Sequence, residues 1–215
     1  MKSLRYRMIY FFGPDGTGKT THAELTAWYL KKMGYRVWRA SVKQHHTLSY
    51  LLLKLLSRKN PGTQAINYYG FNYELGRRIK TPWKILELIS LLPAVVYRVL
   101  LPLCLGYIVV CDRYVLDTLV VLSYFLKEPK MISGKSAKLL VKLIPKDSLL
   151  IHLDADTDVI LHRKRDELLT EQIIKYYKEA YRDLMKKLNL VAITINTGTA
   201  MIEEVQETIK RELHN

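Results

Sequence analysis

A short apolar run, Met8–Phe12, leads directly into a glycine-rich segment and then into a stretch with helical spacing. The run has the continuous apolar character of a strand that is buried on both faces of a sheet. Apolar residues recur at helical spacing from Lys19 to Met33, and Gly34 follows as a C-terminal capping residue. Tyr35–Ala40 then predicts a second strand. The chain therefore opens with a strand–loop–helix–strand unit, which is typical of a parallel α/β sheet.

The glycine-rich segment reads Gly-Pro-Asp-Gly-Thr-Gly-Lys-Thr and matches the pattern G-x-x-x-x-G-K-[ST] at every fixed position. Its glycines let backbone N–H groups approach phosphate oxygens, and the following helix adds its positive N-terminal end. We expect the Lys19 ammonium group to contact the β- and γ-phosphates and the Thr20 hydroxyl to bind Mg²⁺. The segment thus predicts a site for the triphosphate of ATP (or GTP) with magnesium. The predicted nucleotide-binding residues are Gly13, Pro14, Asp15, Gly16, Thr17, Gly18, Lys19, Thr20 and Thr21.

Strands and helices alternate along the rest of the chain. Three more apolar runs predict strands, at Tyr107–Cys111, Ser148–Leu153 and Val191–Ile195. Helical spacing predicts helices at Leu48–Leu56, Val115–Leu126, Glu171–Leu188 and Met201–Leu213. This alternation predicts an α/β fold with a five-stranded parallel sheet and helices on both faces. With the phosphate loop, it indicates the three-layer P-loop NTPase fold, in a single domain over residues 1–215 with a short lid.

The segment Ile85–Leu105 is mostly apolar, and only Glu87 and Arg98 are charged. Its length is that of a membrane span, which takes about 20 apolar residues. Pro93 and Pro102 interrupt the segment, and Arg98 would lie inside the membrane. We therefore predict a long buried helix that is kinked or ended near the prolines, and no membrane span.

The composition favours a partner with negative charge, because 34 Lys and Arg stand against 20 Asp and Glu, for a net charge of +14. Nucleotides, nucleic acid and acidic membranes all meet that description, as does a basic surface without a specific polyanion. No arginine-rich arm, zinc knuckle or helix–turn–helix signature is present, so we do not expect nucleic-acid binding.

The cysteines, Cys104 and Cys111, predict buried thiols, and Met1–Arg7 leads into too short an apolar run for a signal peptide. We expect a cytoplasmic protein.

Asp112 and Arg113 follow the predicted strand Tyr107–Cys111. Ligands of open parallel sheets bind where the strands end at their carboxyl termini. An acidic residue there can hold a magnesium-bound water, and an arginine can bind two phosphate oxygens at once. The alternative is that Asp112 accepts hydrogen bonds from local amides and Arg113 pairs on the surface. Because the chain also has a complete phosphate loop, we predict that Asp112 serves the metal and that Arg113 binds substrate.

A basic segment, Arg163-Lys164-Arg165, follows a helix-forming stretch. Mobile cations that close over a phosphoryl group in transfer stabilise its spread negative charge and exclude water. The alternative is a solvated helix end whose basic residues complement the helix dipole. We predict a lid over residues of about 163–170.

Three stretches together resemble the thymidylate kinase family: Phe12–Thr21, Val110–Tyr114, and Leu153–Asp156 with the basic segment after it. The Asp15-Gly16 pair inside the phosphate loop is more specific than the loop pattern alone. The resemblance implies that ATP phosphorylates dTMP to dTDP and that Mg²⁺ is required. It also implies a homodimer formed through helices beside the sheet, which gives the segment Ile85–Leu101 a partner.

The resemblance further implies roles for single residues. Asp15 would face the sugar hydroxyls of the acceptor, and Arg113 would hold the acceptor phosphate. Relatives with glycine at the position of Gly16 carry their catalytic arginine in the lid, which here means Arg163 or Arg165. The loop Asn196–Thr199 would lie near the adenine of ATP.

The sequence departs from the family in two places. Ser41–His46 stands where relatives have Glu-Pro-Gly-Gly, and no arginine lies near Leu92-Pro93, where an Asp-Arg pair is expected. Arg77, Arg78 or Arg98 could replace that arginine. Two alternative functions therefore stay open: phosphorylation of another small acceptor, and an NTPase switch that binds nucleic acid or a membrane. We interpret His45-His46 as a surface pair rather than a metal site, and Tyr68, Tyr69 and Tyr73 as packing residues.

Overall fold

The computed structural model describes residues 4–42, 77–165 and 169–214. The predictions for Leu48–Leu56, for His45-His46 and for the tyrosines between 68 and 73 lie outside these residues. Five strands form one parallel sheet in the order β2-β3-β1-β4-β5. They are β1 (Met8–Phe12), β2 (Val37–Ala40), β3 (Ile108–Asp112), β4 (Ser148–Asp154) and β5 (Ile193–Asn196).

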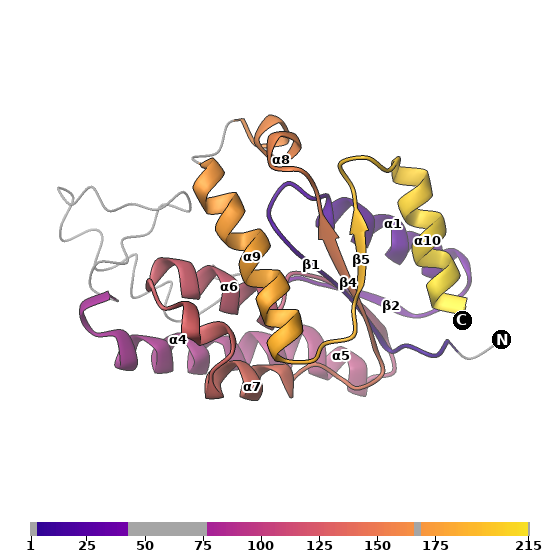
Figure 1. Ribbon diagram of the computed structural model, residues 1–215. Helices are drawn as coiled ribbons and strands as arrows, with labels where there is room; N and C mark the ends of the chain where they lie inside the picture. Colours follow the sequence, from indigo (N-terminus) through magenta and orange to yellow (C-terminus); the bar gives the residue numbers. More distant parts are fainter. Residues whose placement is uncertain (1–3, 43–76, 166–168, 215) are drawn as a thin grey trace.

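Helices cover both faces of this sheet, so the predicted three layers are confirmed (Figure 1). One face carries α1 (Lys19–Lys32) and α10 (Ile202–His214), which pack on Ile9 and Phe11 of β1. Met8, Tyr10 and Phe12 alternate with them and point to the other face, because successive side chains of a strand lie on opposite sides. That face carries α4 (Lys80–Val95), α6 (Val115–Phe125), α7 (Lys135–Val141) and α9 (Glu171–Lys187).

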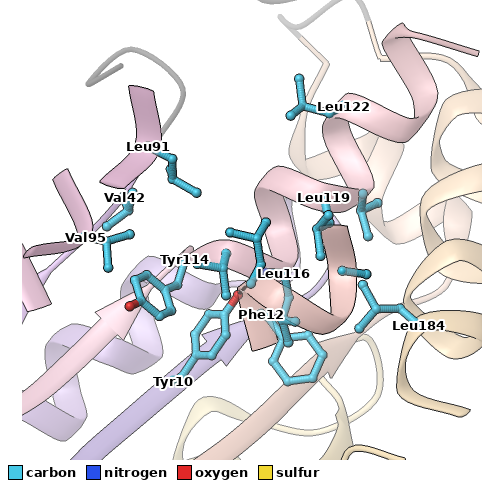
Figure 2. Close-up of a cluster of buried hydrophobic side chains, with 14 of the residues drawn as sticks. Tyr10, Phe12, Val42, Leu91, Val95, Tyr114, Leu116, Leu119, Leu122 and Leu184 are labelled. Carbon is cyan, nitrogen blue, oxygen red and sulfur yellow. Dashed lines mark hydrogen bonds between the residues drawn. The ribbon is translucent and has the colours of Figure 1, made fainter. Parts of the chain in front are cut away.

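The larger of the two cores holds the end of β1 in place, directly before the phosphate loop. Figure 2 shows Tyr10 and Phe12 of β1 among Tyr114, Leu116 and Leu119, which belong to or directly precede α6. The loop therefore starts from a strand whose side chains are fully buried.

A buried carboxylate ties this core together. Asp117 of α6 accepts hydrogen bonds from the hydroxyls of Tyr10 (2.7 Å) and Tyr181 (2.9 Å) and from the backbone N–H of Tyr114 (3.0 Å). Burial raises the pKa of Asp117, and the nearby Lys19 opposes this shift. Asp117 thus links β1, α6 and α9, close to Lys19.

The predicted apolar helix starts at Lys80, earlier than Ile85, and runs through Pro93 in α4. A π-helical turn, η2 (Val96–Leu100), follows, and α5 (Leu101–Cys104) ends the segment. Lys80–Cys104 is long and apolar enough to cross a membrane by length and composition, but 39% of its most apolar window is buried in the protein. The predicted kink near the prolines is thus matched by a change of helix type.

Two predictions about burial in this region were wrong. One side of the helix packs on the core, but a row of large apolar residues on it is exposed: Ile85, Ile89, Leu92, Val96, Tyr97, Leu101 and, just beyond α5, Leu105. We call these seven residues the apolar stripe. Cys104 is exposed as well, and only Cys111 is buried. Apolar character alone did not distinguish a face that packs within the chain from one that does not.

The segment between α6 and α7 contains a 3-10 turn at Pro129–Ile132. A further short helix, α8 (Thr157–Arg163), lies beyond the carboxyl end of β4 (Figure 1). Asp156 stands at its N-cap position, although its side chain makes no capping hydrogen bond. α8 packs over the phosphate loop and forms one wall of the site.

Candidate functional site

The phosphate loop joins β1 to α1 and borders a cavity of about 410 Å³. The loop and the start of α1 form its floor. Arg113, from the end of β3, and Arg163 and Lys164, at the end of α8, add three cationic side chains. Thr197, Ala200 and Ile202, which follow β5, form the remaining wall.

Close packing explains the glycines of this loop. Gly13 has φ 139°, and a Cβ atom there would lie 2.1 Å from the backbone oxygen of Leu153 in β4. Gly16 has φ 89°, and its Cβ would lie 3.1 Å from Cγ of Lys164 and 3.2 Å from Cγ2 of Ile160. Residues other than glycine rarely adopt such φ values. The loop therefore lies against β4 on one side and against α8 on the other.

Lys19 is buried and folded back on the loop that precedes it. Its ammonium group donates to the backbone oxygens of Gly13 (2.6 Å) and Pro14 (2.8 Å) and to the Asp15 carboxylate (3.2 Å). Burial lowers the pKa of Lys19, while Asp15 acts in the opposite direction. A buried ammonium group whose partners are mainly neutral carbonyls favours a more negative partner, such as a phosphate oxygen.

Thr20 at the start of α1 and Asp112 at the end of β3, the two residues predicted to serve the metal, are in contact. The Thr20 hydroxyl donates to Oδ2 of Asp112 at 2.6 Å, and Asp112 is buried. Oδ1 of Asp112 lies 3.6 Å from a guanidinium nitrogen of Arg39, a contact that the sequence did not predict. In the described ranges, no three His, Cys, Asp or Glu side chains gather as a metal site. One hydroxyl and one carboxylate suit Mg²⁺, which keeps waters and takes its other ligands from substrate phosphates.

Arg113 and Asp15, the two predicted substrate-binding residues, form an ion pair. Arg113 has φ 73°, a left-handed conformation that is unusual for a residue with a side chain. Its backbone oxygen accepts a hydrogen bond from the N–H of Val42 at 3.0 Å, which anchors this conformation to the segment after β2. The arginine side chain thus lies between the phosphate loop and the ends of β2 and β3.

The basic segment divides into residues that reach the cavity and one that does not. Arg163 donates to the backbone oxygens of Thr197 (2.8 Å) and Gly16 (3.2 Å), so it joins α8 to the phosphate loop and to the loop after β5. Lys164 also lines the cavity, which the sequence did not single out. Arg165 instead donates to the backbone oxygen of His162 and does not line the cavity.

Two of the three arginines that could replace the family's missing one have clear positions. Arg98, in the π-helical turn, donates to the backbone oxygen of Ser41 at 3.1 Å, at the carboxyl end of β2. Arg77 donates to the backbone oxygen of Phe125 at 2.7 Å, at the end of α6. Of these two, Arg98 is tied to the edge of the sheet where Arg113 also lies.

No family model matches this sequence. The chain is 26% identical, over 220 aligned positions, to a protein of Archaeoglobus fulgidus named "Probable thymidylate kinase"; the match covers 97% of this chain and 95% of the relative. Among solved structures, thymidylate kinase from Ehrlichia chaffeensis matches with a TM-score of 0.58 and 19% identity, over 97% of this chain and 98% of that one. The YorR protein of Bacillus subtilis, solved with phosphorylated GDP, matches with a TM-score of 0.56 and 19% identity, over 96% and 95%.

These matches extend over nearly the whole chain and not only over its motifs. The solved structures confirm the fold, and the sequence relative confirms the resemblance to the thymidylate kinases that the motifs predict. The identities are low, at 26% for the sequence relative and 19% for the two solved structures.

Proposed function

We propose that this chain is a nucleoside monophosphate kinase that transfers the terminal phosphoryl group of ATP to dTMP and forms dTDP. One observation carries this proposal: a complete phosphate loop shares a cavity with Arg113 on one side and with Arg163 and Lys164 on the other. Cations on both sides of a phosphate-binding loop suit a phosphoryl group that moves between two phosphates, because its charge is spread in the transition state.

The donor triphosphate would lie along the phosphate loop, with its base towards Ala200 and Ile202. Lys19 would exchange the backbone oxygens of Gly13 and Pro14 for phosphate oxygens. Thr20 and Asp112 would hold Mg²⁺, Asp112 through a bound water. The ion, when bound, would neutralise charge on the β- and γ-phosphates.

The acceptor would bind at the other side of the loop. Arg113 would hold its phosphate, and Asp15 would accept hydrogen bonds from its sugar. Arg98 lies at the same edge of the sheet, and we propose that it takes the place of the arginine that the family carries earlier on this helix. Leu91 occupies that earlier region and is fully buried in the core.

Transfer itself needs no covalent intermediate on the protein. The two nucleotides are positioned in line, and Lys19, Arg163 and Lys164 stabilise the charge of the phosphoryl group in flight. Arg163 already touches the loop through the Gly16 oxygen, so α8 needs little movement to close the cavity. Closure excludes water, which would otherwise accept the phosphoryl group.

We also propose a cytoplasmic homodimer that buries the apolar stripe. Six residues of the stripe lie on the continuous helical segment α4–η2–α5 and Leu105 directly follows it, and none of the seven is charged. An exposed apolar surface of this extent usually marks an interface. A second copy of the same helix would cover it with matching apolar side chains.

A kinase for a different nucleoside monophosphate is the second candidate, because the sequence lacks the family's Glu-Pro-Gly-Gly stretch. A panel of acceptors decides between the two. ADP formation from MgATP would be measured with dTMP, dUMP, dGMP, GMP, CMP and AMP, and with thymidine. The highest kcat/KM with dTMP is the expected result.

Activity with another monophosphate alone would transfer the assignment to the second candidate. ADP formation that needs no acceptor, and that DNA, RNA or anionic vesicles stimulate, would contradict both and indicate an NTPase switch. Arg98→Lys is the matched variant: it keeps the charge but loses the planar fork that binds two phosphate oxygens. We expect it to raise the KM for dTMP and leave the KM for ATP unchanged.

A further inference from the structure

A buried histidine borders the cavity and has no role in the mechanism above. His22 lies in the first turn of α1, directly after the phosphate loop, and 3% of its surface is exposed. It lines the cavity together with Ala200 and Ile202. A Cβ atom on Gly18 would lie 3.3 Å from the ring Cδ2 and 3.6 Å from Nε2, so this edge of the ring faces the loop.

Gln206 of α10 determines which ring nitrogen carries the hydrogen. Its side-chain nitrogen lies 3.0 Å from Nδ1 of His22 and 3.4 Å from the backbone oxygen of His22. Because a backbone oxygen only accepts, the Gln206 group facing it is the NH₂, and that group also donates to Nδ1. Nδ1 is therefore the acceptor of a neutral ring, and Nε2 carries the hydrogen.

The environment keeps the ring neutral. Burial lowers the pKa of His22, and the positive charge of Arg163 lowers it further. The neutral form with its hydrogen on Nε2 is thus the main one near pH 7. Within residues 4–42, 77–165 and 169–214, this Nε2–H has no hydrogen-bond partner.

The position of His22 along the cavity indicates which part of a nucleotide it meets. Lys19 and the loop backbone lie at the phosphate end. Ala200 and Ile202 form the apolar end, which suits a base, and Gln206 lies one helical turn after Ile202. His22 faces Gly18 of the loop and contacts Gln206 of α10, so it bridges these two elements, and we infer that the sugar of a nucleotide would lie beside it.

We propose that His22 contacts the ribose of the donor nucleotide and that its Nε2–H donates a hydrogen bond to a sugar hydroxyl oxygen. This inference rests on the proposed function, because it takes the cavity as the donor site. A neutral N–H suits a neutral hydroxyl, whereas the phosphates have the cations of the loop and lid. His22 is therefore a specificity-determining residue for ribonucleoside triphosphates.

Calorimetric titration of the full chain tests this contact without relying on turnover. Wild-type protein, His22→Phe and Thr26→Val would each be titrated with the magnesium complexes of ATP, 2′-deoxy-ATP, 3′-deoxy-ATP and tripolyphosphate. Phenylalanine keeps a ring in the buried space but has no donor. Thr26 is buried on the same helix one turn later and does not line the cavity, so Thr26→Val is the matched control.

We expect the wild type and the control to bind ATP about 3- to 10-fold more tightly than one of the deoxy analogues, as one hydrogen bond allows. His22→Phe should lose this preference and keep the wild-type affinity for tripolyphosphate. An unchanged preference in His22→Phe would overturn the inference. An equal loss for ATP and tripolyphosphate would overturn it too, because the contact would then not be with the sugar. Wild-type protein that binds no ATP would instead contradict the proposed function itself.

Discussion

Lys19 is held by the backbone oxygens of Gly13 and Pro14, and we propose that a bound triphosphate replaces them and that the chemistry depends most on this residue. We predict that Lys19→Ala lowers kcat/KM for phosphoryl transfer by about 10²- to 10³-fold, the usual loss when one charge-stabilising donor is removed. Far-UV circular dichroism should show an unchanged secondary structure. Lys31→Ala, an exposed lysine in the last turn of the same helix, is the control and should keep full activity. Wild-type turnover in Lys19→Ala would contradict the assignment.

The two lid arginines should differ, although they are only two residues apart. Arg163 lines the cavity and contacts the phosphate loop, whereas Arg165 contacts His162. We predict that Arg163→Ala lowers kcat by about 10- to 100-fold and that Arg165→Ala changes it by less than about threefold. Steady-state kinetics of both variants under saturating ATP and dTMP measures this. The reverse order would show that Arg165 is the one that reaches the phosphoryl group.

At the scale of single residues, the sequence motifs predicted those site residues whose positions depend on local backbone geometry. The phosphate loop, Asp112 and Arg113 come together because strand ends of a parallel sheet share one edge. Lys164 was predicted only as part of the basic lid segment and His22 was not predicted, since their positions depend on how α8 and α10 pack over the loop. Thr197, whose hydroxyl donates to the Thr17 oxygen at 3.0 Å, depends on packing in the same way.

Strand β4 carries a histidine that makes stability depend on pH. His152 is buried, with its ring centroid 5.2 Å from that of Phe12 and 5.8 Å from that of Tyr181. Its Nε2 has no hydrogen-bond partner among the described residues. Burial lowers the pKa of His152 from 6.5 to about 4. As the pH falls from 6.5 towards 4, the unfolded chain takes up a proton at this residue and the folded chain does not, so stability is lost.

We predict that His152 lowers the unfolding free energy of the wild type by about 2 to 3 kcal/mol when the pH falls from 7.5 to 4.5. His152→Phe removes the titrating group, so its unfolding free energy should fall by that much less over the same range. Urea denaturation at both pH values measures the difference. His162→Gln, at an exposed histidine, is the control and should follow the wild type. Equal losses in wild type and His152→Phe would mean that the histidine is protonated in the folded state.

At the scale of elements, long periodic segments were predictable and short or irregular ones were not. The strands and α1, α6, α9 and α10 match their predicted ranges closely. α7 was not predicted: only Ala137 and Leu140 of this short helix are buried, so its apolar periodicity is weak. The π-helical turn η2 has no sequence signal of its own.

The apolar stripe is the main feature that concerns the molecule as a whole. If it forms a homodimer, the double variant Ile89→Glu, Tyr97→Glu should sediment as a monomer where the wild type sediments at twice that mass, because paired charges would be buried. Sedimentation velocity measures this. Val191→Glu is the control: Val191 is 93% exposed and lies outside the stripe, so that variant should remain dimeric.

A wild-type monomer would contradict the dimer, and co-sedimentation of that monomer with anionic vesicles would assign the stripe to a membrane surface. The sequence predicted that this helix is apolar, but not which side would be left exposed. That depends on the packing of α4 against α6 and the sheet, which periodicity does not specify. The net charge of +14 likewise gives no information on where the cations gather.

We propose above all that the phosphate loop and the cations around its cavity transfer a phosphoryl group between two nucleotides. Incubation with γ-³²P-labelled ATP, Mg²⁺ and dTMP, followed by chromatography of the products, measures this transfer. We predict that the label appears in dTDP, only when dTMP is present, and that Lys19→Ala forms almost none. Label that appears only in inorganic phosphate, at the same rate with and without any nucleoside monophosphate, would contradict the claim.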